Sequence, residues 1–196
     1  ADKFPGNGKD SRWRYSVATQ ARIFQRGSGS NQYLLRGSLG YDLKTGMTLW
    51  AGFDYFLTNP DGGSDRYERR AWQQFSWAVR KWDWGALSLR WRLEERDIEN
   101  ANDTGLRFRQ MAQLAVPVQD KKVTAIFSVE HFQNLNDTDA GARSGFDQLR
   151  SYAGLRLPIS NKSSLEAGYM HQCINRPNGI DFVNHTGMLH LRVKFR

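Results

Sequence analysis

The feature that most constrains this chain is a regular alternation of apolar and charged residues. In residues 88–97, Leu89, Trp91 and Leu93 alternate with arginine and glutamate. A two-residue period is typical of a β-strand, because successive side chains of a strand point to opposite sides. One face of this strand is apolar and the other is charged, so the fold must give the two faces different surroundings.

The same period recurs in about ten segments, separated by clusters of Gly, Asn, Asp and Ser. We predict strands at residues 12–25, 33–43, 47–58, 66–80, 86–97, 105–116, 123–134, 146–157, 163–174 and 183–195. No helical periodicity of useful length interrupts them, so the chain is predicted to be all-β. Many segments reach the roughly 9 to 11 residues with which a tilted strand crosses a bilayer.

One parity of these segments carries no Asp, Glu, Lys or Arg, and the other parity holds most of the strand charges, Arg80 among them. Alternation alone also fits a soluble barrel with an apolar core. Two observations favour a membrane barrel. The chain has seven Trp, seven Tyr and eleven Phe, many near strand ends (Phe195 is one), as in the aromatic girdles of membrane barrels. Long connections rich in Asp, Asn and Gly also alternate with short ones, which is typical of outer-membrane barrels.

We therefore predict a closed, antiparallel, up-and-down transmembrane β-barrel of about ten strands. Residues 1–196 are expected to form this one domain, with a short periplasmic N-terminal segment at 1–11. The start of the chain fits an exported protein whose signal peptide has been removed. The expected location is the bacterial outer membrane.

The net charge of +8 raises the question of an anionic partner, since such a surplus often indicates nucleic acid or anionic lipid. Arginine and aromatic residues lie mainly on opposite strand faces, so they do not form a shared nucleic-acid surface, and we expect no nucleic-acid partner. The lone Cys173 allows no internal disulfide, and no standard metal spacing occurs. No cofactor and no metal are expected.

Several longer motifs carry a resemblance to a family. They are W-R-L-E-E-R-D at 91–97, G-L-R-F-R at 105–109, V-E-H-F-Q-N at 129–134 and L-E-A-G-Y-M-H-Q at 165–172, with E-R-R-A-W-Q-Q at 68–74 and D-Q-L-R-S-Y-A-G-L at 147–155. With them the chain resembles the bacterial family known as domain of unknown function 2490, over most of its length. The resemblance implies an outer-membrane β-barrel and assigns no functional residues.

The candidate site is a set of charged residues at inward-facing positions of neighbouring strands. Its predicted members are Glu68, Arg70, Arg90, Arg92, Glu94, Arg107, Arg109, Glu130, Arg150 and Glu166. A barrel of about eight strands is just filled by side chains, whereas about 16 strands leave a channel. We expect this set to be a structural network that plugs the barrel. The alternative is a narrow anion-favouring passage, because the inward arginines outnumber the carboxylates.

Two pairs of residues suggest catalysis only weakly. His171 and Cys173 share the apolar parity, and a histidine can activate a thiol, but no third orienting group is identifiable. Asp181 and His185 loosely resemble the Asp/His pairs of ten-stranded outer-membrane proteases, but a matching pair of Asp residues is missing. No catalytic residue is therefore predicted.

We favour a non-enzymatic protein that acts as a structural anchor or accessory subunit. Its expected partners are outer-membrane lipids or lipopolysaccharide and a protein of an outer-membrane complex. A pore or transporter for small anionic solutes is the second reading, and a lipid-modifying enzyme is the third.

Overall fold

Alternating sequence of this kind folds into one continuous sheet in the computed structural model, which describes residues 2–3, 11–23, 31–60, 63–118, 122–176 and 179–194. The strands are β1 (Asp2–Lys3), β2 (Trp13–Arg22), β3 (Asn31–Lys44), β4 (Met47–Asn59), β5 (Arg66–Lys81), β6 (Ala86–Ile98), β7 (Gly105–Val118), β8 (Val123–Asn134), β9 (Gly145–Pro158), β10 (Ser163–Ile174) and β11 (Phe182–Val193). Each strand pairs antiparallel with its neighbours in the chain, so the sheet order is the sequence order. The all-β, up-and-down prediction with ten long strands is confirmed.

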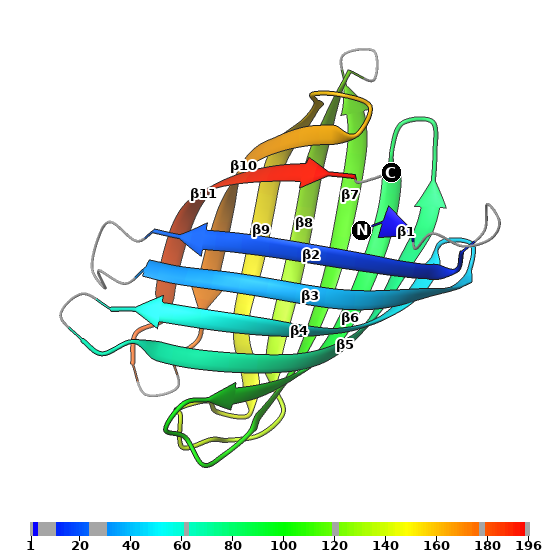
Figure 1. Cartoon of the computed structure of the whole chain (residues 1–196). Coiled ribbons are helices and arrows are strands. Elements are labelled where there is room, and N and C mark those ends of the chain that lie inside the picture. Colours follow the sequence, from blue (N-terminus) through cyan, green and yellow to red (C-terminus); the bar gives the residue numbers. More distant parts are fainter. Residues whose placement is uncertain are drawn as a thin grey trace.

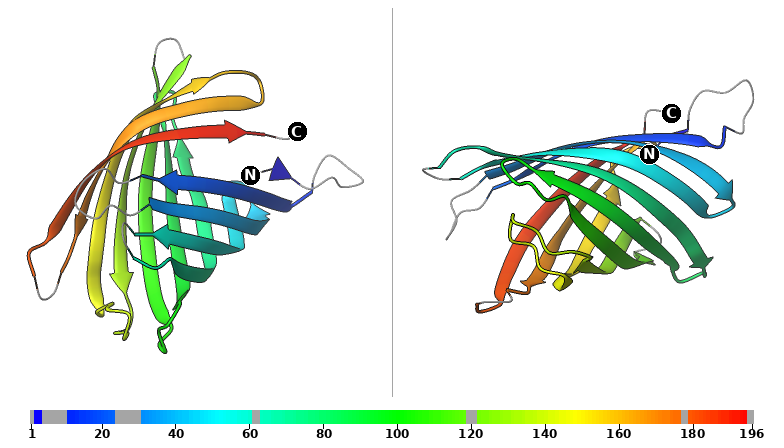
Figure 2. Two further views of the ribbon diagram at one scale, coloured as in Figure 1. Left: turned by 60° about the vertical axis from the view of Figure 1, so that its left-hand side comes forward. Right: turned by 90° about the horizontal axis from the view of Figure 1, so that it is seen from below.

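The sheet curls so that one of its faces encloses the interior (Figures 1 and 2). Its connections differ at the two ends. At one end, which we call the short-turn end, the strands are joined by residues 45–46, 82–85, 119–122 and 159–162. At the other, the long-loop end, they are joined by residues 23–30, 60–65, 99–104, 135–144 and 175–181. Thr45 and Gly46 make the tightest turn, and Gly46 has a φ of 79°, which glycine adopts without a Cβ clash.

Closure of the barrel, which we also predicted, is not shown. Within the described residues β11 pairs only with β10, and β2 pairs with β3 and with the two-residue strand β1. The strand β1 was not predicted, and it partly explains why β2 and β11 are not paired. Its pairing with Arg14 and Tyr15 occupies the β2 edge that a closing strand needs near the short-turn end. β11 runs in the opposite direction to β2, but within the described residues the two strands make no close backbone contact (Figures 1 and 2).

The two faces of the sheet have the burial expected of an inside-out protein. The outer face leaves large apolar side chains exposed, among them Val17 at 70%, Leu35 at 58% and Leu189 at 71% of their surface. The interior holds the buried charges, with Glu94 and Asp54 at 0%. The apolar side of this sheet therefore faces its surroundings, contrary to the soluble-barrel alternative. No helix of the described residues is long and apolar enough to cross a membrane.

The strand register shifts at three places among the described residues, and one of these shifts changes the face on which a residue lies. Between Ala78 and Arg80 the register slips by one residue, so that Arg80 pairs with Leu87, a residue of the outer face. The prediction that Arg80 points inward is therefore wrong. Of the other predictions, Phe195 and most of the segment 1–11 lie outside the described residues.

Candidate functional site

A buried group of charged side chains joins β6, β7 and β8 inside the sheet, and we call it the central cluster. Its members are Arg90, Arg92, Glu94, Arg107, Arg109 and Glu130. Glu94 accepts hydrogen bonds from Arg107 at 2.7 Å and from Arg109 at 2.5 Å. Arg109 also donates to Glu130 at 2.7 Å, and Arg90 donates to the same carboxylate. Arg109 thus bridges two carboxylates, and the three strands form one hydrogen-bonded unit.

Aromatic rings fill the space between these guanidinium groups. The Arg92 guanidinium lies 3.9 Å from the centre of a Trp72 ring, and Arg70 lies 3.8 Å from the ring centre of Phe56. Phe132 has no exposed surface. Around it stand Arg107, Arg109 and Arg150, at 5.3, 4.4 and 4.5 Å from the ring centre. These cation–π contacts pack the interior with apolar surface while the charged groups keep favourable partners.

Glu68 forms a second ionic group towards the long-loop end. It accepts a hydrogen bond at 2.6 Å from Arg70 on its own strand and another at 2.6 Å from Arg96 on β6. Arg96 was left out of the predicted site although its parity points inward. Its place opposite Arg70 in the register brings it to Glu68.

Of the remaining two predicted residues, Glu166 lies apart from the central cluster, whereas Arg150 lies beside the cluster, against the ring of Phe132. Glu166 on β10 pairs with Arg156 at 2.7 Å and Arg192 at 3.2 Å, and Tyr152 donates to it at 2.9 Å. We call these four residues the Glu166 group. Arg150 donates to the amide oxygen of Gln148 at 3.1 Å and has no carboxylate within ion-pair distance among the described residues. The predicted set is therefore several groups and not one network.

The predicted site left out part of the interior, although the parity of Asp54 and Arg36 already pointed inward. Asp54, fully buried, accepts hydrogen bonds from Arg36 and from the Trp72 indole, the latter at 2.7 Å. The position of Trp72 could have been predicted from its parity. Trp72 occupies an inward position of a charged strand, so its indole cannot contact lipid and must pack inside the barrel. Asp147 contacts Arg107 at 3.5 Å, and it does so next to a bulge that breaks the simple alternation of β9.

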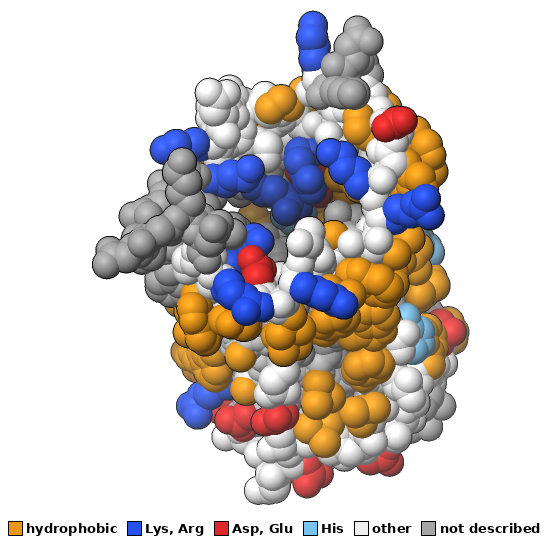
Figure 3. Space-filling model, turned by 90° about the vertical axis from the view of Figure 1, so that its right-hand side faces the viewer, with side chains coloured by type: hydrophobic (Ala, Val, Ile, Leu, Met, Phe, Trp, Pro, Cys, Tyr) orange, Lys and Arg blue, Asp and Glu red, His pale blue; other side chains and the backbone are white. Residues whose placement is uncertain are grey.

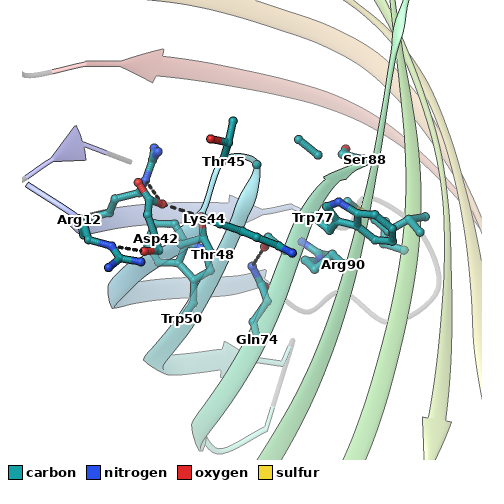
Figure 4. A pocket seen from close by; sticks show the side chains of 16 residues that line it. Arg12, Asp42, Lys44, Thr45, Thr48, Trp50, Gln74, Trp77, Ser88 and Arg90 are labelled. Carbon is teal, nitrogen blue, oxygen red and sulfur yellow. Dashed lines mark hydrogen bonds and ion pairs between the residues drawn. The ribbon is translucent and has the colours of Figure 1, made fainter. Parts of the chain in front are cut away.

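The short-turn end opens into a hollow of about 800 Å³, which we call the vestibule. Seen from that end, basic side chains gather around it (Figure 3). Its lining comes from the residues before β2 and from β2 to β7, and includes Arg12, Arg14, Asp42, Lys44, Trp50 and Arg90 (Figure 4). Arg90 belongs both to the vestibule and to the central cluster. The vestibule therefore ends at the buried charges.

The residue pairs that suggested catalysis are not assembled into catalytic groups. The Cys173 sulfur lies 3.8 Å from Nδ1 of His171, and the described residues supply no carboxylate to orient that histidine. Asp181 accepts from the backbone of Arg176, whereas the His185 ring contacts the hydroxyl of Tyr169. The described part of the chain also contains no group of three or more His, Cys, Asp or Glu placed to hold a metal ion.

Comparison with known proteins agrees with the motifs. The family model described as "Protein of unknown function (DUF2490)" matches residues 4–184. An uncharacterised protein of Methylorubrum extorquens is 33% identical over 184 residues, which are 92% of this chain and 80% of that protein. The chain belongs to the DUF2490 family. The resemblance predicted from the motifs is confirmed.

Two solved structures resemble this DUF2490 protein in overall shape. One is the KdgM porin in complex with disordered oligogalacturonate, with 11% sequence identity, a TM-score of 0.49, and coverage of 93% of this chain and 92% of that one. The other is the KdgM porin, also with 11% identity and a TM-score of 0.49, covering 94% of this chain and 97% of that one.

Proposed function

We propose that this DUF2490 protein is an integral outer-membrane β-barrel whose interior is blocked by side chains. The observation that carries the proposal is the inverted burial, with leucines, valines and aromatic residues exposed and arginine and glutamate buried. Water solvates an exposed apolar face of this size poorly, whereas acyl chains match it. The ten long strands have 10 to 16 residues each, enough to cross a bilayer when tilted.

The residues at the two ends of the apolar outer face also fit a position across a membrane. At the long-loop end the apolar face gives way to an exposed ion pair, Arg69 with Asp97 at 3.7 Å. At the short-turn end Trp82 and Trp84 stack at 5.2 Å between ring centres. Charges beyond one border and tryptophans at the other are typical of the two interfaces of a membrane barrel.

In the membrane we expect β11 to pair with β2 and close the barrel. An open sheet edge in hydrocarbon leaves backbone N–H and C=O groups without partners, which costs several kcal/mol for each group. The two strands run in opposite directions, as an antiparallel pair requires (Figure 1). Only Arg14 and Tyr15 of the β2 edge are paired with β1, so most of that edge remains for β11.

The central cluster supports a role as an anchor and not as an open pore. Glu94 and Arg109 are buried, and each has at least two charged partners. Rings fill the spaces between the charges. We therefore propose that the barrel is an anchor in the outer membrane. Its outer face contacts lipid or lipopolysaccharide, and its long loops bind a protein partner.

Planar-bilayer recordings test this proposal. The wild-type protein is expected to give no steady current. The double variant Arg90→Ala/Glu130→Ala removes both partners of one ion pair and leaves Arg109 with Glu94, so it is expected to open a small conductance. The matched control is Arg69→Ala/Asp97→Ala, which removes an ion pair from the outer face of the neighbouring strands β5 and β6 and should stay silent. A steady wild-type current would contradict the blocked interior.

A narrow passage for small anions is the second candidate, and the charge excess of the interior favours it. The central cluster has four guanidinium groups and two carboxylates. Rings of arginine favour anions in pores. A wild-type current that reverses at the equilibrium potential of chloride in a salt gradient would support this candidate, whereas a silent bilayer supports the anchor.

A further inference from the structure

The vestibule is lined by an excess of positive charge. Neither insertion in the membrane nor blocking of the interior by the central cluster requires this excess. Its lining has four cationic side chains, Arg12, Arg14, Lys44 and Arg90, and one carboxylate, Asp42. These cations come from different parts of the wall, because Arg12 and Arg14 lie at the start of β2, Lys44 ends β3 and Arg90 lies on β6. Figure 4 shows that Lys44 and Arg90 come from different strands of the wall. The vestibule therefore concentrates positive charge from several directions.

The single carboxylate does not neutralise this charge. Asp42 accepts a hydrogen bond at 2.7 Å from Arg14 and another at 2.8 Å from the hydroxyl of Thr48. It is thus engaged on the wall of β2 to β4. Lys44 is exposed, and its ammonium group makes no hydrogen bond or ion pair with any described residue. An anion in the vestibule would meet this ammonium group without displacing a protein partner.

Arg90 adds a donor that the protein leaves unsatisfied. One of its terminal nitrogens donates to Glu130, but its Nε is buried and has no hydrogen-bond partner among the described residues. A buried N–H without an acceptor is unfavourable, and native proteins rarely keep one without an acceptor from water, an ion or a ligand. Arg90 lines the vestibule, so an oxyanion bound there lies near this unpaired N–H group.

An aromatic wall accompanies the charges. Trp50 lies across β3 at Gly40, where an added Cβ would stand only 2.6 Å from the indole Cε3. Glycine at this position therefore lets the ring lie over the strand, inside the barrel. Trp50 and Met111 give the vestibule an apolar surface next to its cations. That combination suits an organic anion better than a bare inorganic ion, because the carbon skeleton also gains contacts.

We propose that the vestibule binds a small organic anion that carries carboxylate or phosphate groups. Its oxygens contact Lys44 and Arg90, and its carbon skeleton lies against Trp50. The site needs only the vestibule and goes beyond the proposed anchoring function. It is tested by binding and not by current, so its failure would leave the blocked barrel standing.

Isothermal titration calorimetry of the detergent-solubilised full chain at low ionic strength tests the site, with citrate and inorganic phosphate as probes. Wild-type protein is expected to bind citrate saturably at one site. Lys44→Gln should weaken binding about tenfold, as expected when one charge-assisted hydrogen bond to an oxyanion is lost, and Lys44→Glu should weaken it further. Lys162→Gln, at an exposed lysine in another short turn outside the vestibule, is the matched control and should bind as the wild type does.

Native mass spectrometry after addition of phosphatidylglycerol identifies the source of the oxyanion. A bound lipid that is lost in Lys44→Glu assigns the site to a lipid headgroup, whereas citrate binding without bound lipid assigns it to a soluble anion. Both results support the site. Absence of saturable citrate, phosphate and lipid binding overturns it, and so does binding that is equal in the wild type and Lys44→Glu. Lys44 is exposed, so its variants are expected to fold, and the mobility of unheated samples in gel electrophoresis checks this.

Discussion

Glu94 and Glu166 are both buried inward carboxylates held by arginines, yet their surroundings differ. Glu94 is fully buried, and the side chains of its partners Arg107 and Arg109 are exposed by 6% and 10%. Glu166 is also nearly buried, but its partner Arg192 on β11 has a side chain exposed by 54%. The interior is therefore sealed on the side of β6 to β8 and loosely packed towards the open edge of the sheet. A similar ion pair is worth different amounts on the two sides, because solvent screens the second.

The largest expected effect is that of Glu94→Ala. It leaves three buried arginines, Arg92, Arg107 and Arg109, with fewer partners. Breaking a buried ionic group in this way typically costs about 3 to 5 kcal/mol of unfolding free energy. Urea unfolding of the protein in lipid vesicles, followed by tryptophan fluorescence, measures the change. A loss below about 1 kcal/mol would mean that water reaches the cluster and that the two sides are alike.

The next effect tests whether the seal depends on rings as well as on charges. At Gly52 an added Cβ would collide with the Trp72 indole, whereas at Gly37 it would meet nothing within 4 Å. Gly52→Ala is therefore expected to destabilise by about 1 to 3 kcal/mol through overpacking, and Gly37→Ala by much less. The same urea titration compares them. Equal effects at the two glycines would show that Trp72 moves freely.

Glu166→Gln is expected to cost less than Glu94→Ala, about 1 kcal/mol. Gln keeps an acceptor for Tyr152, and Arg192 can turn to solvent. The prediction distinguishes the two sides most directly. If Glu166→Gln matched Glu94→Ala in unfolding free energy, the Glu166 group would be as well sealed as the central cluster, and β11 would be held firmly.

The smallest effect belongs to a carboxylate outside the strands. Asp139, exposed in the loop 135–144, accepts hydrogen bonds from the backbone of Asn102, which lower its pKa below the ordinary 3.8. A lowered pKa stabilises the folded loop fully above the ordinary value, and this contribution is lost as the pH falls through the folded value. Hydrogen exchange at the Asn102 amide should therefore stay protected at pH 6 and lose protection once the pH falls below the ordinary 3.8. Protection that is unchanged in Asp139→Asn would contradict this.

The sequence predicts the strands well, because alternation and turn residues are local properties. The predicted strand at 123–134 and the one at 163–174 coincide with β8 and β10, and the others differ by a few residues at their ends. Parity also placed Glu94 and Arg109 inside. It failed at Arg80, where a bulge moves the side chain to the outer face.

The grouping of the interior charges could not be read from the sequence. Whether Glu166 joins Glu94 depends on how strongly the sheet curls, and curvature depends on contacts between distant strands. The strand β1 was also missed. It has only two residues, which are too few to show the two-residue alternation from which strands are predicted. The aromatic packing of the interior could have been predicted from the sequence, because Trp72 and Phe132 lie at inward positions of charged strands.

The sequential strand order also bears on how the barrel assembles. Each observed pairing joins neighbours in the chain, so a growing sheet can add one hairpin at a time with little loop entropy to overcome. Joining β11 to β2 would be the one step that brings together opposite ends of the polypeptide. That step is expected to come last and to set the rate at which the finished barrel appears.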